Sequence, residues 1–174
     1  QAAVSVLLSR DELSAAASLA DSHLPEGADD NLLEACVLLT SRTNPSQSYR
    51  FVRRIRNGAT AASFALELME HWSASDAETT LLTVLTRGPD SEGEAALRTA
   101  LAKLKLFTRV QSVASTLWST WQEVSAACAA NAGDVVTRLI ELHAYDEAGE
   151  VVSAYELQQL LGSVEEQQLL FELN

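Results

Sequence analysis

Proline, glycine and aromatic residues are scarce in this sequence. Its 174 residues include three prolines and seven glycines, and aromatic side chains make up 6% of the chain. Chains built from β-strands need frequent turn residues and are enriched in β-branched and aromatic side chains. Here alanine and leucine are abundant, and hydrophobic residues make up 47% of the chain. This composition predicts closely packed helices and argues against a fold based on sheets.

Basic residues are also scarce. The chain has 12 Lys and Arg residues against 24 Asp and Glu residues, which gives a formal net charge of −12. Because phosphate backbones and anionic lipid surfaces attract basic proteins, this charge argues against nucleic acid as the main partner and against general membrane adhesion. No apolar run approaches the ~20 residues of a membrane span, and no secretory leader pattern opens the sequence.

Candidate catalytic and metal-binding residues are few. Cys36 and Cys128 lie in segments rich in Ala, Leu and Val, which predicts two buried thiols in a reducing compartment. Neither cysteine has a histidine nearby in the sequence that could activate it as a nucleophile. His23, His71 and His143 show no metal-ligand spacing, and no glycine-rich phosphate loop is present. We therefore expect no metal, no cofactor and no enzymatic activity. The alternative is an enzyme whose catalytic groups come from distant helices.

The stretch from Val135 to Leu157 predicts two short helices joined at a corner. Apolar residues keep helical spacing on both arms, with Val135, Leu139, Ile140 and Leu142 on the first and Ala148, Val151, Val152 and Tyr155 on the second. Tyr145 is expected to plug the corner, and the small Ala148 to let the two helices approach closely. A pair this short cannot bury its own apolar face, so it must stack on similar pairs, as in a solenoid.

Two other stretches match this pattern, with Leu13 (residues 4–24) and Phe107 (residues 101–114) in the position of Tyr145. We therefore expect an all-α fold, an α-α superhelix of stacked antiparallel helix pairs with about a dozen helices. Residues 1–174 would form one helical-repeat segment, cut from a larger scaffold protein.

Capping and breaking residues predict the other helix ends. The predicted features are a break at 25–27, a helix from Asp29 or Asp30 to Ser41, a helix from Ser46 to Arg56 closed by a left-handed Gly58, a helix from Thr60 to His71, a helix from Ser75 to Thr86, a break at 87–90, helices from Glu92 to Lys105 and on to Trp118, a helix from Ser119 or Thr120 to 131–133, a cap at Asp134, and a last helix from Ser163 to Leu173.

An arginine cluster is the best candidate for specific recognition. Arg50, Arg53, Arg54 and Arg56 place four of the twelve basic residues within seven positions, and on a helix Arg50, Arg53 and Arg54 would share one face. Such a cluster could bind phosphate or the carboxylates of a partner protein. The alternative is a solvated face that pairs with acids of a neighbouring repeat. From Asp134 to Asn174 there are nine acids and one base, which suits either docking to a basic partner or simple solubilisation.

The order of these features resembles the helical-repeat region of the spastizin family, large FYVE-finger proteins of endolysosomal trafficking. The matching stretches are 49–52, 61–72 ending in LELMEHW, 77–85, 96–110, 121–124 and 135–155, so the resemblance covers about residues 5–160. It implies a non-enzymatic, cytoplasmic scaffold that is peripheral on late endosomes and lysosomes through its parent protein. It also implies pairing with spatacsin and the fifth adaptor-protein complex, and a role in retrieval traffic, autophagy and lysosome reformation.

No cysteine-rich zinc finger lies in this chain, so zinc and phosphoinositide binding do not carry over from that family. The matched pattern is a packing pattern, and it transfers no functional residue. The alternative function is a helical scaffold of another system, such as a vesicle tether, the nuclear pore or the kinetochore.

Overall fold

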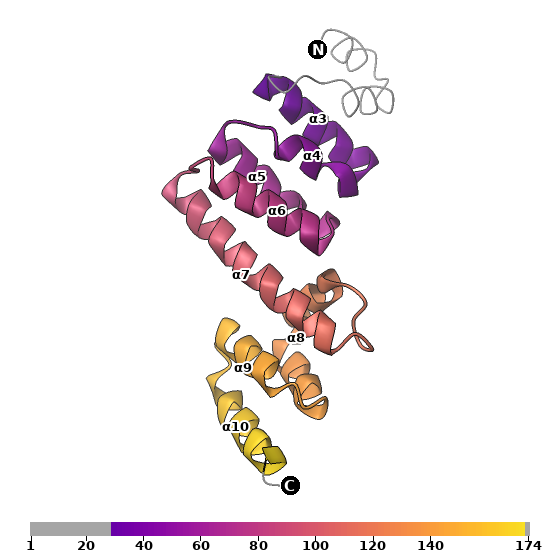
Figure 1. Cartoon of the computed structure of the whole chain (residues 1–174), viewed down its shortest axis with the longest axis vertical. Coiled ribbons are helices and arrows are strands. Elements are labelled where there is room, and N and C mark those ends of the chain that lie inside the picture. Colours follow the sequence, from indigo (N-terminus) through magenta and orange to yellow (C-terminus); the bar gives the residue numbers. More distant parts are fainter. Residues whose placement is uncertain (1–28, 173–174) are drawn as a thin grey trace. The chain divides into compact units, whose positions relative to one another are not determined.

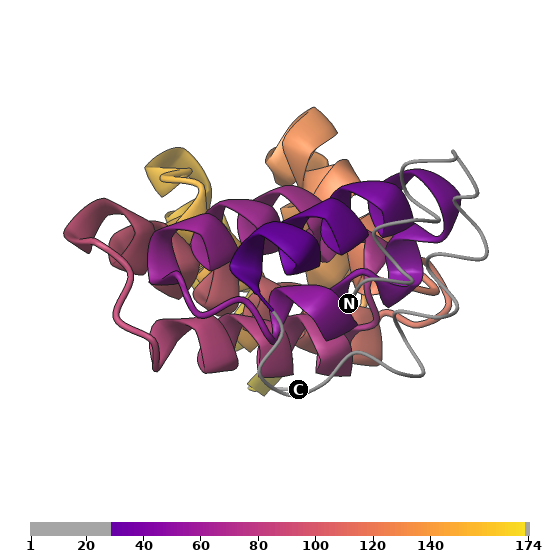
Figure 2. The same ribbon diagram turned by 90° about the horizontal axis from the view of Figure 1, so that it is seen from above.

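The part of the chain that the structure describes is all-helical, as the composition predicts. The computed structural model describes residues 29–172, and these contain helices and no strand (Figures 1 and 2). The elements are α3 (Asp30–Thr43), the 3-10 helix η1 (Pro45–Gln47), α4 (Tyr49–Val52), α5 (Gly58–Leu68), the 3-10 helix η2 (Met69–His71), α6 (Ala74–Leu85), α7 (Ser91–Val113), α8 (Trp121–Glu141), α9 (Tyr145–Ala154) and α10 (Gln158–Glu172).

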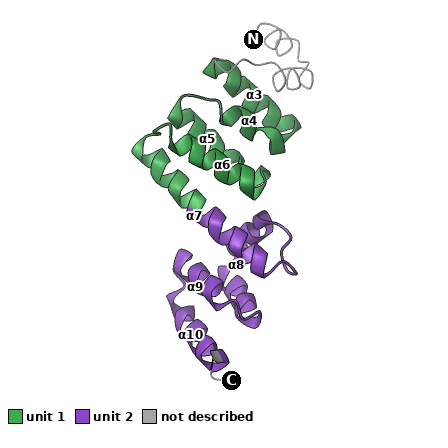
Figure 3. Cartoon of the chain, viewed as in Figure 1, with its two compact units in different colours: residues 1–101 green, residues 102–174 purple. Residues whose placement is uncertain are grey.

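The chain divides into two compact units, residues 1–101 and 102–174, and the boundary falls within α7 (Figure 3). Each unit is considered by itself below. The predicted repeat at residues 4–24 and the predicted break at 25–27 lie outside the described residues.

Helix α3 begins where its capping residue predicts. The Asp29 carboxylate accepts a hydrogen bond from the backbone N–H of Asn31 at 3.3 Å, which satisfies one of the N–H groups left free at a helix start. The helix continues to Thr43, two residues beyond the predicted end. Its buried face carries Leu33, Cys36, Val37, Leu39 and Thr40.

The predicted helix from Ser46 to Arg56 is wrong. Ser46 lies inside η1, and α4 has only four residues. The residue that organises this segment is Ser48, which is fully buried: its hydroxyl donates to the Pro45 carbonyl at 2.7 Å and accepts the indole N–H of Trp72 at 2.9 Å. Trp72 is itself fully buried in this unit. A tertiary contact therefore sets the backbone here, in place of local helix propensity.

Asn57 and Gly58 start a helix, contrary to the prediction that they end one. The Asn57 side chain accepts the N–H of Thr60 at 3.1 Å and so caps α5. Gly58 is needed for space, because a Cβ on it would lie 3.0 Å from the backbone nitrogen of Pro89. The left-handed glycine is Gly88, with φ +63°, in the predicted break at 87–90. Helix α6 begins after Ser73, two residues before the predicted Ser75 cap.

Helix α7 is continuous through the predicted corner at Phe107, so that prediction is wrong. Leu104, Phe107, Val110 and Ala114 are all buried, with the three- and four-residue spacing of one helix face. The residues around Phe107 include no proline or glycine that would break the helix. The apolar pattern shared with the Tyr145 corner is therefore a helix stripe and not the sign of a turn.

The predicted corner at Tyr145 is confirmed. Helices α8 and α9 pack against each other, and the chain reverses through His143, which has φ +59°. The Tyr145 side chain is 9% exposed and Ala148 is fully buried, as a plug and a point of close approach require. The Tyr145 hydroxyl lies 2.9 Å from Nδ1 of His143.

The predicted break at 131–133 appears as a kink inside α8. Asn131 has φ −161° and ψ 95°, and its side-chain oxygen accepts the N–H of Gly133 at 3.1 Å. Asn131 is thus the cap of the second half of the helix, in place of the predicted Asp134. Thr120 caps the first half by accepting the N–H of Glu123, which confirms one of the two predicted caps. Helix α10 runs through Ser163, so the predicted start there is wrong.

Candidate functional site

The predicted arginine cluster does not form one helix face. Arg50 is exposed within α4, Arg53 follows α4 as its cap, and Arg54 and Arg56 lie beyond the helix. Arg53 and Arg54 are half-buried, whereas Arg56 is exposed. The guanidinium groups of Arg50 and Arg53 both lie over the Tyr49 ring, 6.0 and 4.5 Å from its centroid, whereas Arg54 and Arg56 follow the end of the helix.

Arg53 links α4 to α6. Its Nε donates to the hydroxyl of Thr80 at 2.8 Å, and its Nη2 donates to the carbonyl of Asp76 at 2.8 Å and to the Asp76 carboxylate at 3.2 Å. The guanidinium also lies over the Tyr49 ring, 4.5 Å from its centroid, in a cation–π contact. Arg53 thus holds this unit together, and its donors are directed to internal acceptors.

Arg87 is the arginine that sequence reasoning missed. Its guanidinium donates to the backbone carbonyls of Val52, Arg53 and Ile55, which lie at and just beyond the end of the short α4. The Val52 carbonyl also accepts the backbone N–H of Ile55 at 3.3 Å. Burial lowers the pKa of Arg87, and the charge of Asp30 opposes that effect. No local signal marks this role, since Arg87 lies 32 to 35 residues from the carbonyls it binds.

Asp30 supports the same segment from the other side. Its carboxylate accepts the backbone N–H groups of Arg56, at 3.0 and 3.1 Å, and of Asn57, at 2.9 Å. Burial raises the pKa of Asp30, but these hydrogen bonds and the charges of Arg56 and Arg87 outweigh it, and the net effect is a lowered pKa. The arginine-rich segment is therefore fixed largely by its own neighbours.

The predicted cysteines are buried thiols. Cys36 lies in the first unit and Cys128 in the second, and both are free. Burial raises the pKa of each thiol to about 11, which opposes thiolate formation and nucleophilic chemistry. His71 and His143 are exposed, and His23 lies outside the described residues. Over residues 29–172, no three His, Cys, Asp or Glu side chains gather as metal ligands would.

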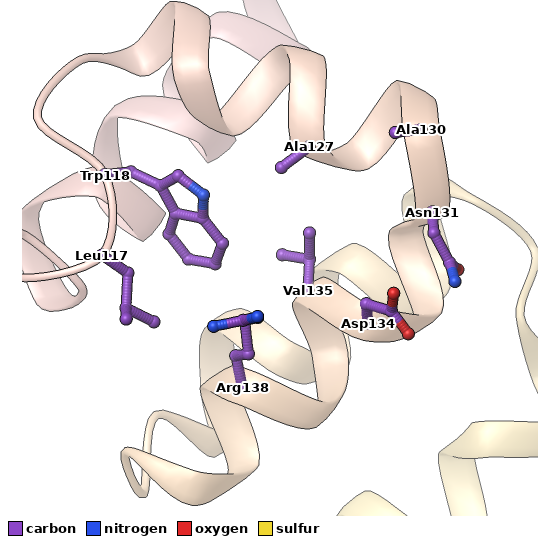
Figure 4. Close-up of a pocket in the computed structure, with 8 residues that line it drawn as sticks. All are labelled: Leu117, Trp118, Ala127, Ala130, Asn131, Asp134, Val135 and Arg138. Carbon is purple, nitrogen blue, oxygen red and sulfur yellow. The ribbon is translucent and has the colours of Figure 1, made fainter.

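A pocket of about 400 Å³ lies in the second unit, on the inner side of the α8 kink. Ala127, Ala130 and Asn131 line it from the first half of the helix, and Asp134, Val135 and Arg138 from the second half. Leu117 and Trp118, from the segment between α7 and α8, close a third side (Figure 4). Its volume lies within the range of protein binding pockets.

The pocket combines an apolar wall with polar groups that have no partner within the described part of the chain. The Trp118 indole N–H and the Arg138 guanidinium make no hydrogen bond there, and the Asp134 carboxylate accepts none. In Figure 4 the Trp118 ring and the Arg138 side chain converge on the same space, whereas Asp134 lies toward the opposite end. The break at 131–133 was predictable from sequence. The packing of Trp118 over the kink was not.

No helix among the described residues is long and apolar enough to cross a membrane. Large apolar side chains are exposed on α10, including Leu161, Leu169, Leu170 and Phe171.

Comparison with known proteins yields a distant similarity. The chain is 23% identical to "Protein DDB_G0276689" of Dictyostelium discoideum over 193 aligned residues, which cover 97% of this chain and 7% of that protein. The chain thus spans about 7% of the length of this relative. No family model matches the chain, and no solved structure matches it.

Proposed function

We propose that this chain is a non-enzymatic segment of a protein–protein interaction scaffold, built as an α-solenoid of stacked helix pairs. The observation that carries the proposal is sequential packing inside each unit. In the first unit α3 packs on α4, α4 on α5 and α5 on α6; in the second, α8 packs on α9 and α9 on α10. Solenoid repeats contact mainly their neighbours along the chain, whereas compact bundles bring distant elements together.

Contacts between alternate helices fit the same architecture. Helix α4 also contacts α6, and α8 also contacts α10, as expected when one helix pair lies against the next. Among the described residues, both cysteines are buried, and His71 and His143 are exposed. The match of nearly the whole chain to a small part of a much longer protein supports a segment of a large scaffold.

The resemblance to the spastizin helical-repeat region supports an endolysosomal setting for that scaffold. The proposed partners are spatacsin and subunits of the fifth adaptor-protein complex, on late endosomes and lysosomes. Affinity purification of the intact parent protein, followed by mass spectrometry, tests this assignment. Recovery of spatacsin and the adaptor subunits is expected. Recovery of vesicle-tether, nuclear-pore or kinetochore subunits in their place would contradict it and favour the alternative scaffold.

The partner contact proposed for the arginine cluster rests on its two exposed members, Arg50 and Arg56. Charge reversal of both (Arg50→Glu with Arg56→Glu) in the parent protein should reduce co-purification of the partner while the chain stays folded. A modest fall in melting temperature is expected, because the attraction between Arg56 and Asp30 is lost. Arg98→Glu is the matched control, because Arg98 is exposed on α7 and pairs only one turn away with Glu94. A double variant that folds and still retains its partner would show that these arginines are solvated surface residues.

A further inference from the structure

We propose that the pocket at the α8 kink binds an acidic peptide segment of a partner protein, with an apolar side chain against the pocket wall and a carboxylate on Arg138. This inference deepens the proposed function, since it assumes that the chain binds proteins. It concerns the surface lined by Leu117, Trp118, Ala127, Asn131, Val135 and Arg138.

The shape of the pocket follows from the kink. The non-helical backbone at Asn131 turns the second half of α8 away from the first, and the Asn131 side chain caps the new start through Gly133. A continuous helix would present one convex surface. The kinked helix instead has an inner angle, and Trp118 encloses it from the side (Figure 4).

The wall of the pocket selects for an apolar side chain. Val135 is 2% exposed and belongs to the packed floor of the pocket, whereas Leu117 is 40% exposed and Trp118 is half-buried. Ala127 and Ala130 keep the side formed by the first half of α8 shallow. A leucine or phenylalanine side chain placed here would remove exposed parts of Leu117 and Trp118 from water, which is favourable at about 25 cal/mol per Å² of apolar surface.

Charge complementarity identifies the second part of the ligand. Arg138 is the single base among residues 134–174, which include nine acids, and the chain as a whole has twice as many acids as bases. Intramolecular carboxylates are thus plentiful, yet the Arg138 guanidinium has no partner in the part of the chain that the structure describes. In Figure 4 the guanidinium lies below the six-membered ring of Trp118, so a charged donor group stands next to the apolar wall. A carboxylate accepts two parallel hydrogen bonds from one guanidinium, which makes it the group that fits this end of the pocket.

Asp134 sets the direction of binding. Its carboxylate lies at the other end of the pocket from Arg138 (Figure 4) and would repel an acid placed there. The acidic group of the ligand must therefore lie at the Arg138 end. Free phosphate or acetate would satisfy the donors but leave the apolar wall exposed, which is why the inferred ligand is a peptide and not a small anion.

The test is a titration of the full chain with two capped hexapeptides, followed by NMR of the tryptophan indole N–H groups. One peptide is acetyl-Glu-Leu-Leu-Asp-Glu-Leu-amide, and the matched peptide has each acid replaced by its amide. The chain has three tryptophans, so Trp118→Phe assigns the Trp118 signal by its loss. We expect the acidic peptide to shift the Trp118 signal, with binding at least about tenfold weaker for the amide peptide and weaker again at higher salt.

Two variants and a control locate the binding. Arg138→Gln should weaken binding of the acidic peptide about tenfold to the level of the amide peptide, and Ala127→Leu should block both peptides by filling the pocket. Arg98→Gln removes the same charge from α7 far along the chain and should leave binding unchanged. Circular dichroism verifies that each variant is folded. If either Arg138→Gln or Ala127→Leu does not fold, the comparison uses the other of these two variants.

Four results would overturn the inference: no shift of the Trp118 signal at millimolar peptide, equal binding of the two peptides, unchanged binding by folded Arg138→Gln, or the same shift with acetate alone. A shift that depends on protein concentration without peptide would assign the pocket to a second copy of the chain and would also overturn it. These results differ from failure of the scaffold proposal, because the parent protein can still recover partners through another surface when the pocket binds no peptide.

Discussion

Truncation of Tyr145 tests the packing of the second unit most sharply. The side chain is 9% exposed, and its ring centroid lies 5.9 Å from that of His143 and 5.9 Å from that of Phe171. Replacing a buried aromatic side chain by alanine loses its transfer free energy and leaves a cavity, at a typical cost of about 3–5 kcal/mol. For Tyr145→Ala we expect about 3 kcal/mol, the lower end, because Phe171 is itself exposed and can shift toward the gap.

The hydroxyl contributes little to that loss. It lies 2.9 Å from Nδ1 of His143, an exposed residue, and the net value of such a hydrogen bond is about 1 kcal/mol. Tyr145→Phe should therefore cost about 1 kcal/mol or less, and the remainder of the alanine effect belongs to the ring. The control is Leu169→Ala on α10, where the side chain is 59% exposed and the expected change is within about 0.5 kcal/mol.

Urea unfolding followed by far-UV circular dichroism measures all three variants. For a chain of this size, about 3 kcal/mol corresponds to a fall in melting temperature of about 6–12 °C. A Tyr145→Ala cost below about 1 kcal/mol, or one equal to that of Tyr145→Phe, would refute the interpretation of Tyr145 as the packed plug of the corner between α8 and α9.

Three further predictions concern backbone space, ionisation and an internal cation. Gly58→Ala should destabilise the chain by about 1–3 kcal/mol in thermal unfolding, because the added Cβ would meet the Pro89 backbone at 3.0 Å. Gly149→Ala, whose Cβ meets nothing within 4 Å in α9, should stabilise the chain by about 0.5–1 kcal/mol. Effects of the opposite signs would contradict the difference in space around the two glycines. Burial raises the pKa of Cys36 and Cys128 from 9.0 to about 11, so the folded state favours the protonated thiols. Their contribution to the free energy of unfolding is therefore complete below pH 9 and is lost as pH rises toward 11. Urea midpoints that stay constant between pH 9 and 11 would contradict this prediction. Arg87→Ala should cost about 2 kcal/mol, because the carbonyls of Val52, Arg53 and Ile55 lose the guanidinium as a donor. A urea midpoint equal to that of wild type would show that water replaces the guanidinium at no cost.

Sequence predicted the features that depend on neighbouring residues. The caps at Asp29 and Thr120, the break after α6 and the corner at Tyr145 each follow from local rules about helix ends and side-chain size. Burial of the two cysteines followed from their apolar surroundings. These features involve residues within a few positions of one another, so the pattern contains the information needed.

Features that depend on distant residues were missed. A serine followed by an arginine-rich stretch predicted a long helix, but the buried Ser48 binds Trp72, 24 residues away, and the backbone turns to permit it. The continuous α7 was divided because an apolar stripe on one helix resembles the stripe across a corner. The sequence alone suggests that Arg53 is a surface charge. In the structure its guanidinium donates a hydrogen bond to Thr80, 27 residues away.

The candidate pocket was half predictable. The break at Asn131 follows from the sequence of asparagine, alanine and glycine, and so does a change of helix direction there. The position of Trp118 depends on how the segment between α7 and α8 packs, and no local pattern specifies it. An arginine cluster is visible in the sequence because its members are neighbours. The isolated Arg138 gains its importance only from the packing of Trp118, which the sequence does not reveal.

Small-angle X-ray scattering of the chain in solution tests the proposed architecture most directly. A compact domain of 174 residues has a radius of gyration of about 16 Å. Helix pairs that stack in sequence form a longer body, so we predict a folded, bell-shaped Kratky profile together with a radius of gyration clearly above that value. A bell-shaped profile with a radius close to about 16 Å would contradict the solenoid and, with it, the scaffold that we propose.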